Sequence, residues 1–304
     1  MPRVTILLAT CNSAAHLSEQ LDSYVAQRGV QWDLWISDDG STDTTRALID
    51  TFCARHGAGR TIRLIDGPRA GPAANFMSLL THPDLPTHGP VALSDHDDVW
   101  HPDKLARALD ALHHSGPMTL YSGQSHHTNA ALRVIGASRP PPRPPSFRNA
   151  LTQNVVSGHS TVMDAQALAL VRRAGVPQGI PYHDWWLYQL VSGAGGTINI
   201  DTARMIHYRQ HGANAMGAHD GLRATLQRAT QVLGHTYGGW IAANTAALRA
   251  VSPLLTPENR AVLQIFEDTR PGFGRMRALW RAGLYRQTRA ASAVFYAAAA
   301  LGRL

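Results

Sequence analysis

The sequence predicts an α/β fold in which a mostly parallel sheet is flanked by helices and followed by a C-terminal helical extension. Over the first hundred residues, apolar strand-like runs alternate with segments of helical periodicity, which is typical of parallel strands joined by right-handed crossovers. Beyond about residue 217 the chain is rich in alanine and arginine and helical in pattern. A length of 304 residues with 44% hydrophobic and 16% charged residues is sufficient for a folded core.

Four strands and three helices are expected in order along this first part of the chain. The strand at 4–9 is a continuous apolar run, as in a strand covered on both faces. Further strands are expected at 33–37, 61–66 and 90–93, helices at 13–27, at 42–56 and after the loop that begins at 67, and strand-like pieces at 118–123 and 131–136. Ligands of parallel sheets bind beyond the carboxyl ends of the strands. The polar residues that end these strands are therefore the candidates for a site.

The charge balance favours anionic partners. The formal net charge is +7 and the pI about 9.9, which suits nucleotide diphosphates, nucleic acid or an anionic membrane face. Two cysteines, Cys11 and Cys53, do not make a disulfide framework, so a cytoplasmic location is expected. The N-terminal apolar run is too short for a signal sequence, and no apolar run reaches the roughly 18 residues of a membrane span.

The most informative segment is the acidic one that follows the fourth strand. Asp95, Asp97 and Asp98 lie within four residues, and three adjacent carboxylates repel one another unless a cation is present. Oxygen ligands suit Mg²⁺ or Mn²⁺, which can bridge to diphosphate oxygens. The alternative is a solvated acidic turn ahead of the helix that starts near residue 102.

A second acidic segment ends the second strand. A carboxylate at Asp38 or Asp39 can accept a hydrogen bond from a base or a ribose hydroxyl. Ser41 and Asp43 are explained by capping of the next helix, but capping does not explain two adjacent acids at the edge of a sheet.

Together these motifs resemble one family. ATCN (9–12), SDDGSTD (37–43) and SDHDDVW (94–100) are similar to motifs of the family 2 glycosyltransferases, which have the Rossmann-like GT-A fold of nucleotide-diphospho-sugar transferases. VSGHSTVMD (156–164), HDWWL (183–187) and YRQHGAN (208–214) follow in the family's order. The resemblance covers about residues 3–215 and is greatest to the rhamnosyltransferase-type branch. Cys11 replaces a usual aromatic residue and His96 a usual glutamine.

The resemblance implies a domain division and a donor site. A glycosyltransferase domain would span 1–216, with a nucleotide-binding half at about 1–100 and an acceptor-binding half at about 101–216, and 217–304 would be a helical region. The nucleotide sugar would contact Thr10, Asn12, Asp39, Asp95, His96 and Arg209, and Mg²⁺ or Mn²⁺ would be bound by Asp97 and His211, with Asp98 in support.

On the acceptor side, the resemblance implies Asp184 as the general base. It would take the proton of the acceptor hydroxyl as that oxygen displaces the nucleotide diphosphate with inversion. Gly158, His159, Trp185 and Trp186 would contact the acceptor. Three alternatives stay open: Asp184 as a helix N-cap, the tryptophans as core residues, and His211 as an ordinary hydrogen-bonded residue.

The predicted function is an inverting, metal-dependent transfer of a sugar to a hydroxyl of a glycan or lipid-linked acceptor in cell-surface polysaccharide synthesis. By resemblance the donor is dTDP-rhamnose, with UDP-hexoses next, and a non-catalytic nucleotide-sugar or glycan binding protein is the alternative. A dinucleotide oxidoreductase is disfavoured because no G-x-G-x-x-G follows a strand. Nucleic acid is disfavoured because acidic strand ends repel phosphate when no cation is bound.

The C-terminal segment combines arginines with apolar and aromatic residues. Residues 270–289 contain six arginines, a pattern that can lie on an anionic membrane face. The expected location is therefore cytoplasmic, with peripheral contact to the inner face of the cell membrane. The alternative is an ordinary helix pair with a basic exposed side. The apolar stretch 291–302 is too short to span a bilayer.

Overall fold

The structure is a computed structural model that describes residues 1–210, 235–268, 270 and 272–304. The chain divides into two compact units. The N-terminal unit comprises Met1–Pro140, Val156–Val176 and Thr197–Gly217, and the C-terminal unit comprises Pro141–Val155, Pro177–Gly196 and Ala218–Leu304. The predicted functional division at residue 216 stays a prediction.

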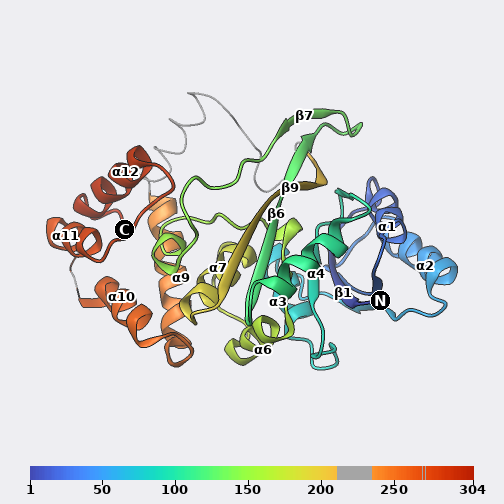
Figure 1. Ribbon diagram of the computed structural model, residues 1–304, viewed down its shortest axis with the longest axis horizontal. Helices are drawn as coiled ribbons and strands as arrows, with labels where there is room; N and C mark the ends of the chain where they lie inside the picture. The colour runs from blue at the N-terminus through green and yellow to red at the C-terminus, as the bar shows by residue number, and fades with distance from the viewer. Residues whose placement is uncertain (211–234, 269, 271) are drawn as a thin grey trace. The chain divides into compact units, whose positions relative to one another are not determined.

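The N-terminal unit is built on one mixed sheet (Figure 1). Its described strands are β1 (Arg3–Thr10), β2 (Gln31–Asp38), β3 (Ile62–Asp66), β4 (Val91–Ser94), β5 (Val99–Trp100), β6 (Thr119–Thr128), β7 (Val134–Ala137), β8 (Val162–Met163) and β9 (Thr197–Arg209). Their order is β3-β2-β1-β4-β8-β6-β9-β5, and β7 pairs with β6. The sheet is mostly parallel because the long pairings, β1 with β2 and β6 with β9, are parallel, whereas the antiparallel pairings are short.

Helices cover both faces of this sheet. Val4, Ile6 and Leu8 of β1 are fully buried in a cluster with apolar residues of α1 (Leu17–Val25), α2 (Thr45–His56) and α4 (Lys104–His114). Alternate residues of a strand point to opposite faces. The helix α3 (Pro72–Leu80) contacts β1 and β2 without joining that cluster, so it covers the other face, where α6 (Ala165–Ala174) contacts it.

The C-terminal unit is helical. Its described helices are α5 (Phe147–Ala150), α7 (His183–Gly193), α9 (His235–Ala250), η2 (Ser252–Leu254), α10 (Pro257–Asp268), α11 (Phe273–Arg281) and α12 (Arg289–Ala300). Every residue of α7 from Trp185 onward is buried, and a Cβ at Gly193 would lie 2.9 Å from Phe147 and Leu255. α7 is therefore the central helix of this unit. No described helix has the length and hydropathy needed to cross a membrane.

The predicted fold class is confirmed. The four strands and three helices expected in the first hundred residues are present, and the C-terminal extension is helical. Three strands were not predicted, the short β5 and β8 and the long β9, and β6 extends well beyond its predicted end.

Asp201 of β9 fixes helix α4 to the sheet. Its carboxylate accepts hydrogen bonds from Arg107 Nε at 2.5 Å, Arg107 Nη2 at 2.9 Å and the Tyr121 hydroxyl at 2.8 Å. Burial alone would raise the pKa of Asp201, but the hydrogen bonds from Arg107 and Tyr121 outweigh it and lower the pKa to about 2.

Asp201→Asn should therefore destabilise the protein by about 2 kcal/mol, the range for hydrogen bonds to a charged group. Because the folded-state pKa is lowered, the stabilisation is present above the unfolded-state pKa and is lost as the pH falls towards 2. Urea unfolding at neutral and acid pH should show a difference between wild type and variant that shrinks with acidity. Asp110→Asn, which changes an exposed residue of α4, is the control. An equal loss of stability in both variants would contradict the role of Asp201 in holding α4 to the sheet.

Candidate functional site

The acidic loop 95–98 follows β4 in the N-terminal unit. The Ser94 hydroxyl anchors its start, because it accepts hydrogen bonds from Gln20 at 2.9 Å and from the Tyr24 hydroxyl at 2.6 Å. Asp97 and Asp98 are buried, whereas Asp95 and His96 are half-buried. The loop is thus not a freely solvated turn.

Asp95, Asp98 and His159 form a group with the chemistry of a cation site. One ligand atom from each lies within 4.8 Å of the other two. Asp98 Oδ2 and His159 Nε2 are buried without a hydrogen-bond partner among the described residues. Two carboxylates and one imidazole fit a divalent cation such as Mn²⁺ or Mg²⁺.

The electrostatics of this group are unfavourable without a cation. Burial, followed by the charges of Asp97 and Asp95, raises the pKa of Asp98 well above its ordinary value. Burial and the nearby Lys104 lower the pKa of His159 to about 4, so its imidazole is neutral, as a metal ligand must be. A bound cation would remove the repulsion between the acids and accept the unpaired nitrogen.

His159 is held in place by its neighbours. It lies in the short 3-10 turn η1 (Gly158–Ser160), where Gly158 is buried, and its ring stacks on Tyr208 with centroids 4.7 Å apart. The Ser160 hydroxyl is 2.9 Å from that of Ser122 on β6. The sequence placed Gly158 and His159 on the acceptor side. The structure brings His159 to the acids, and its acceptor contact stays a prediction.

Arg209 is buried beneath the acidic loop. Its Nε donates to the Asp97 carbonyl at 2.9 Å and its backbone N–H to Asp98 Oδ1 at 3.2 Å, while its other nitrogens bond the Ala130 carbonyl and the Glu19 carboxylate. With 1% of its surface exposed, Arg209 acts as a positioning residue for the loop. Its predicted contact with the nucleotide sugar stays a prediction.

Lys104 is the single lysine of the chain, and sequence reasoning missed it. It is 1% exposed, its Nζ lies 3.5 Å from the centre of the Trp100 ring, and that nitrogen has no hydrogen-bond partner among the described residues. Burial lowers its pKa to about 7, although the charge of Asp98 acts in the opposite direction. Its amine is close enough to Asp98 for the two groups to interact electrostatically.

The ends of β1 and β2 lie side by side, with Thr10 opposite Asp38. The Thr10 hydroxyl donates to Asp38 at 3.1 Å, and Arg46 donates to Asp38 at 2.7 Å. Asn12, at a φ of 48°, accepts a hydrogen bond from the Thr42 N–H at 2.8 Å and donates its own N–H to Ser41 at 2.8 Å. Asp38 is therefore a structural acid that ties the two strand ends together.

Asp39 is half-buried and orders the following loop. Its carboxylate accepts hydrogen bonds from the backbone N–H groups of Arg69 at 2.5 Å and Gly71 at 3.0 Å. A Cβ at Gly67 would lie 2.8 Å from this carboxylate, so the position suits glycine alone. The predicted contact of Asp39 with a nucleotide base is not tested by this geometry and stays a prediction.

Asp184 lies in the first turn of α7 in the C-terminal unit. The helix is capped at Tyr182, so Asp184 is not the N-cap that the alternative interpretation required. Its carboxylate accepts the N–H of Trp185 at 2.7 Å. An acid in the first helical turn is stabilised by the helix dipole. The hydrogen bond to Trp185 and the position in the first turn give Asp184 a structural role, and its role as a base stays a prediction.

Both tryptophans after Asp184 are buried. Trp186 is 0% exposed, and Trp185 is 4% exposed and donates its ring N–H to the Ala150 carbonyl at 2.7 Å. These contacts favour the core-packing alternative over acceptor stacking.

The predicted metal ligand His211 lies outside the described residues.

The chain is similar to known proteins over much of its length. Residues 5–176 match the family described as Glycosyl transferase family 2. The chain is 26% identical over 225 residues to the dTDP-rhamnosyl transferase RfbG of Shigella flexneri, covering 73% of this chain and 77% of that protein.

Two solved structures have a similar fold. TarS (residues 1–349) of S. aureus, in complex with UDP-GlcNAc, has a TM-score of 0.55 at 13% identity, covering 92% of this chain and 89% of that one. The mannosyltransferase PcManGT of Pyrobaculum calidifontis, in complex with GDP-Man and Mn²⁺, has a TM-score of 0.52 at 18% identity, covering 99% and 87%. These likenesses confirm the predicted GT-A fold. Since the family match spans more than half of its length, the chain belongs to glycosyl transferase family 2.

Proposed function

We propose that this glycosyltransferase transfers L-rhamnose from dTDP-rhamnose, with inversion and with a divalent cation, to a hydroxyl of a glycan or lipid-linked acceptor at the cytoplasmic face of the membrane. The observation that carries the donor is the similarity to a dTDP-rhamnosyl transferase over 73% of the chain. The cation is supported by the unpaired atoms of Asp98 and His159 beside Asp95.

The residues of the N-terminal unit would bind the donor. Asp95, Asp98 and His159 would hold the cation, with Asp97 beside them, and Asp39 and the ends of β1 and β2 would contact the nucleoside. When bound, the cation would stabilise the negative charge that grows on the leaving diphosphate. Arg209 would keep the acidic loop in one conformation through its bonds to Asp97 and Asp98, so that the ligands do not reorganise when the donor binds.

Asp184 would act on the acceptor. As a carboxylate in the first turn of α7, it would accept the proton of the acceptor hydroxyl while that oxygen forms a bond to the anomeric carbon. The bond from that carbon to the diphosphate oxygen breaks in the same displacement, which inverts the configuration.

A panel of nucleotide sugars tests the proposal. dTDP-rhamnose, dTDP-glucose, UDP-GlcNAc, UDP-glucose and GDP-mannose would each be added with Mn²⁺, with Mg²⁺ or with chelator, and thermal unfolding would be followed. A ligand at 100 times its Kd stabilises a folded protein by about 2.7 kcal/mol. We expect dTDP-rhamnose to give this protection only when a cation is present.

Each of the other outcomes would change one part of the proposed function. Protection by a UDP-hexose alone would replace the proposed donor while keeping the transferase. Protection that is unchanged by chelator would refute the cation. Protection by dTDP-rhamnose without release of dTDP in the presence of acceptor glycans would favour a binding protein.

A further inference from the structure

The net positive charge of the chain comes from the C-terminal unit. That unit contains thirteen arginines and five acidic residues, a formal charge of +8, whereas the N-terminal unit has fifteen basic and sixteen acidic residues. The net charge of +7 is thus not a property of the site that would bind an anionic donor. It needs another explanation.

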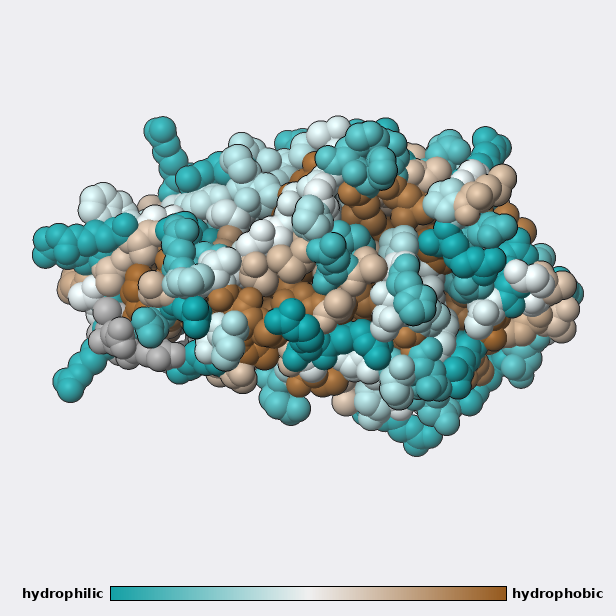
Figure 2. Space-filling view, turned by 60° about the horizontal axis from the view of Figure 1, so that its bottom comes forward, coloured by the Kyte–Doolittle hydropathy of each residue, from teal (hydrophilic) through white to brown (hydrophobic). Residues whose placement is uncertain are grey.

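The charge is densest around helices α11 and α12. Residues 270–304 contain seven arginines and no acidic residue. Among the described side chains of this unit, Arg148 pairs with Glu258, and neither Arg277 nor Arg281 of α11 has a carboxylate partner. Figure 2 shows hydrophilic side chains that project at the left of the view, where these helices lie, with apolar side chains between them.

Large aromatic side chains are exposed among these arginines. Phe273 is 76% exposed and Trp280 is 65% exposed. They are seven residues apart on α11, which places them on one face of the helix, and Arg277 and Arg281 lie on the same face. An exposed tryptophan and phenylalanine, flanked by arginines that have no carboxylate partner among the described side chains, is the composition of helices that lie in a membrane interface.

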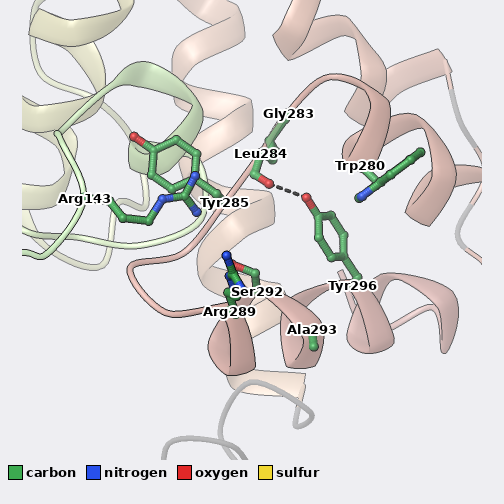
Figure 3. A pocket seen from close by; sticks show the side chains of 9 residues that line it. All are labelled: Arg143, Trp280, Gly283, Leu284, Tyr285, Arg289, Ser292, Ala293 and Tyr296. Carbon is green, nitrogen blue, oxygen red and sulfur yellow. Dashed lines mark hydrogen bonds between the residues drawn. The ribbon is translucent and has the colours of Figure 1, made fainter.

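A cavity of about 420 Å³ opens beside this face, in the same unit. Figure 3 shows Arg143 and Tyr285 on one side of it, Trp280 on the opposite side, and Arg289 and Ser292 at the start of α12. The Arg143 guanidinium lies 3.7 Å from the centre of the Tyr285 ring and donates to the Arg286 carbonyl at 3.4 Å. Neither Arg143 nor Arg289 has a carboxylate partner among the described residues.

We propose that the α11–α12 surface (Arg143, Phe273, Arg277, Trp280, Arg281 and Arg289) docks on an anionic phospholipid bilayer. A lipid phosphate would occupy the cavity between Arg143 and Arg289, and the Phe273 and Trp280 side chains would enter the headgroup region. The guanidinium groups of Arg143 and Arg289 provide donors for phosphate oxygens. Arginines close to an anionic leaflet add about 1 kcal/mol each.

The lipid surface fits these observations better than nucleic acid does. Arginines bind the phosphates of nucleic acid, and exposed aromatic side chains contribute only where unstacked bases can pack against them. Paired nucleic acid would therefore leave Phe273 and Trp280 without a role. A bilayer interface accommodates both kinds of side chain at once. Docking of this surface would be independent of the sugar that is transferred.

Vesicle co-sedimentation of the full chain, without donor, tests the proposal. The protein should bind vesicles that contain phosphatidylglycerol and should not bind vesicles of phosphatidylcholine alone, and added salt should weaken the binding. Arg143→Gln combined with Arg289→Gln should lower the partition coefficient about 30-fold, which corresponds to about 2 kcal/mol. Phe273→Ser combined with Trp280→Ser should lower it about tenfold.

Matched controls use exposed residues of the N-terminal unit. Arg28→Gln with Arg55→Gln removes the same charge, and Val134→Ser with Ile135→Ser removes exposed apolar surface. Neither control should change vesicle binding by more than about twofold. Equal losses in the control and test variants, or no preference for anionic vesicles, would overturn the proposal. So would binding of single-stranded oligonucleotides that competes fully with the vesicles.

Discussion

Asp98→Asn should abolish cation-dependent donor binding while it stabilises the cation-free protein. The substitution keeps an oxygen that can accept the Arg209 N–H, which is 3.2 Å from Asp98 Oδ1. It removes a buried charge that lies beside Asp95 and Asp97 and whose pKa is raised by burial and by these two acids. Burial of an uncompensated charge is costly, so the loss of that charge makes the free energy of unfolding larger.

The stability gained by Asp98→Asn should increase with pH. A carboxyl group whose pKa is higher in the folded state binds more protons there, so its ionisation lowers stability as the pH rises above the unfolded-state value. In chelator, the melting temperature of Asp98→Asn should therefore exceed that of the wild type by an amount that grows from acid to neutral pH. With Mn²⁺ and donor the order should reverse.

The transferase activity of Asp98→Asn should fall about a thousandfold, the cost of losing electrostatic stabilisation of a leaving group. Asp95→Asn and Asp97→Asn, measured beside it, determine which acids bind the cation, since the resemblance assigns Asp97 and the geometry groups Asp95 with Asp98. Asp103→Asn, a half-exposed acid five residues after Asp98, is the control and should keep activity. Donor binding by Asp98→Asn at wild-type strength would refute the cation site.

The first half of the fold could be predicted because its strands have a local signature. β1 is buried along seven of its eight residues, so its sequence is continuously apolar, and the helices between the strands have regular periodicity. β9 has no such signature, because its residues are mostly half-exposed. It is stabilised by β6, about 80 residues earlier in the chain, and a non-local pairing of this kind cannot be inferred from a local pattern.

Only part of the candidate site could be predicted from the sequence, because some of its residues are brought together by non-local strand pairing. Strand-end acids are visible in the sequence, but the proximity of His159 to Asp98 depends on the antiparallel pairing of β4 with β8, in which Ala92 is opposite Val162. That pairing places the residues before β8 beside the residues after β4. The burial of Trp185, Trp186 and Lys104 depends on tertiary packing, so it could not be predicted from the local sequence.

Asp184→Asn should abolish transfer while leaving donor binding and the fold unchanged. A positioned general base contributes about 10²–10⁴-fold to a rate, and asparagine cannot accept the proton. The amide oxygen can still accept the Trp185 N–H, which is 2.7 Å from the carboxylate, so the helix start is preserved. Loss of the favourable helix-dipole interaction should lower the stability by less than about 1 kcal/mol.

Three measurements separate a catalytic base from a helix-end residue. The kcat of Asp184→Asn should fall about a thousandfold, cation-dependent protection by donor should be unchanged, and the melting temperature should shift only slightly. Asp164→Asn is the matched control, because Asp164 caps α6 by accepting the Ala167 N–H at 2.7 Å. If charge at a helix start were all that mattered, both variants would lose a little stability and neither would lose turnover. If Asp184 is the catalytic base, turnover should collapse in Asp184→Asn alone. The attacking hydroxyl must lose its proton as its oxygen bonds to the sugar, and an asparagine side chain can accept a hydrogen bond but cannot take up that proton.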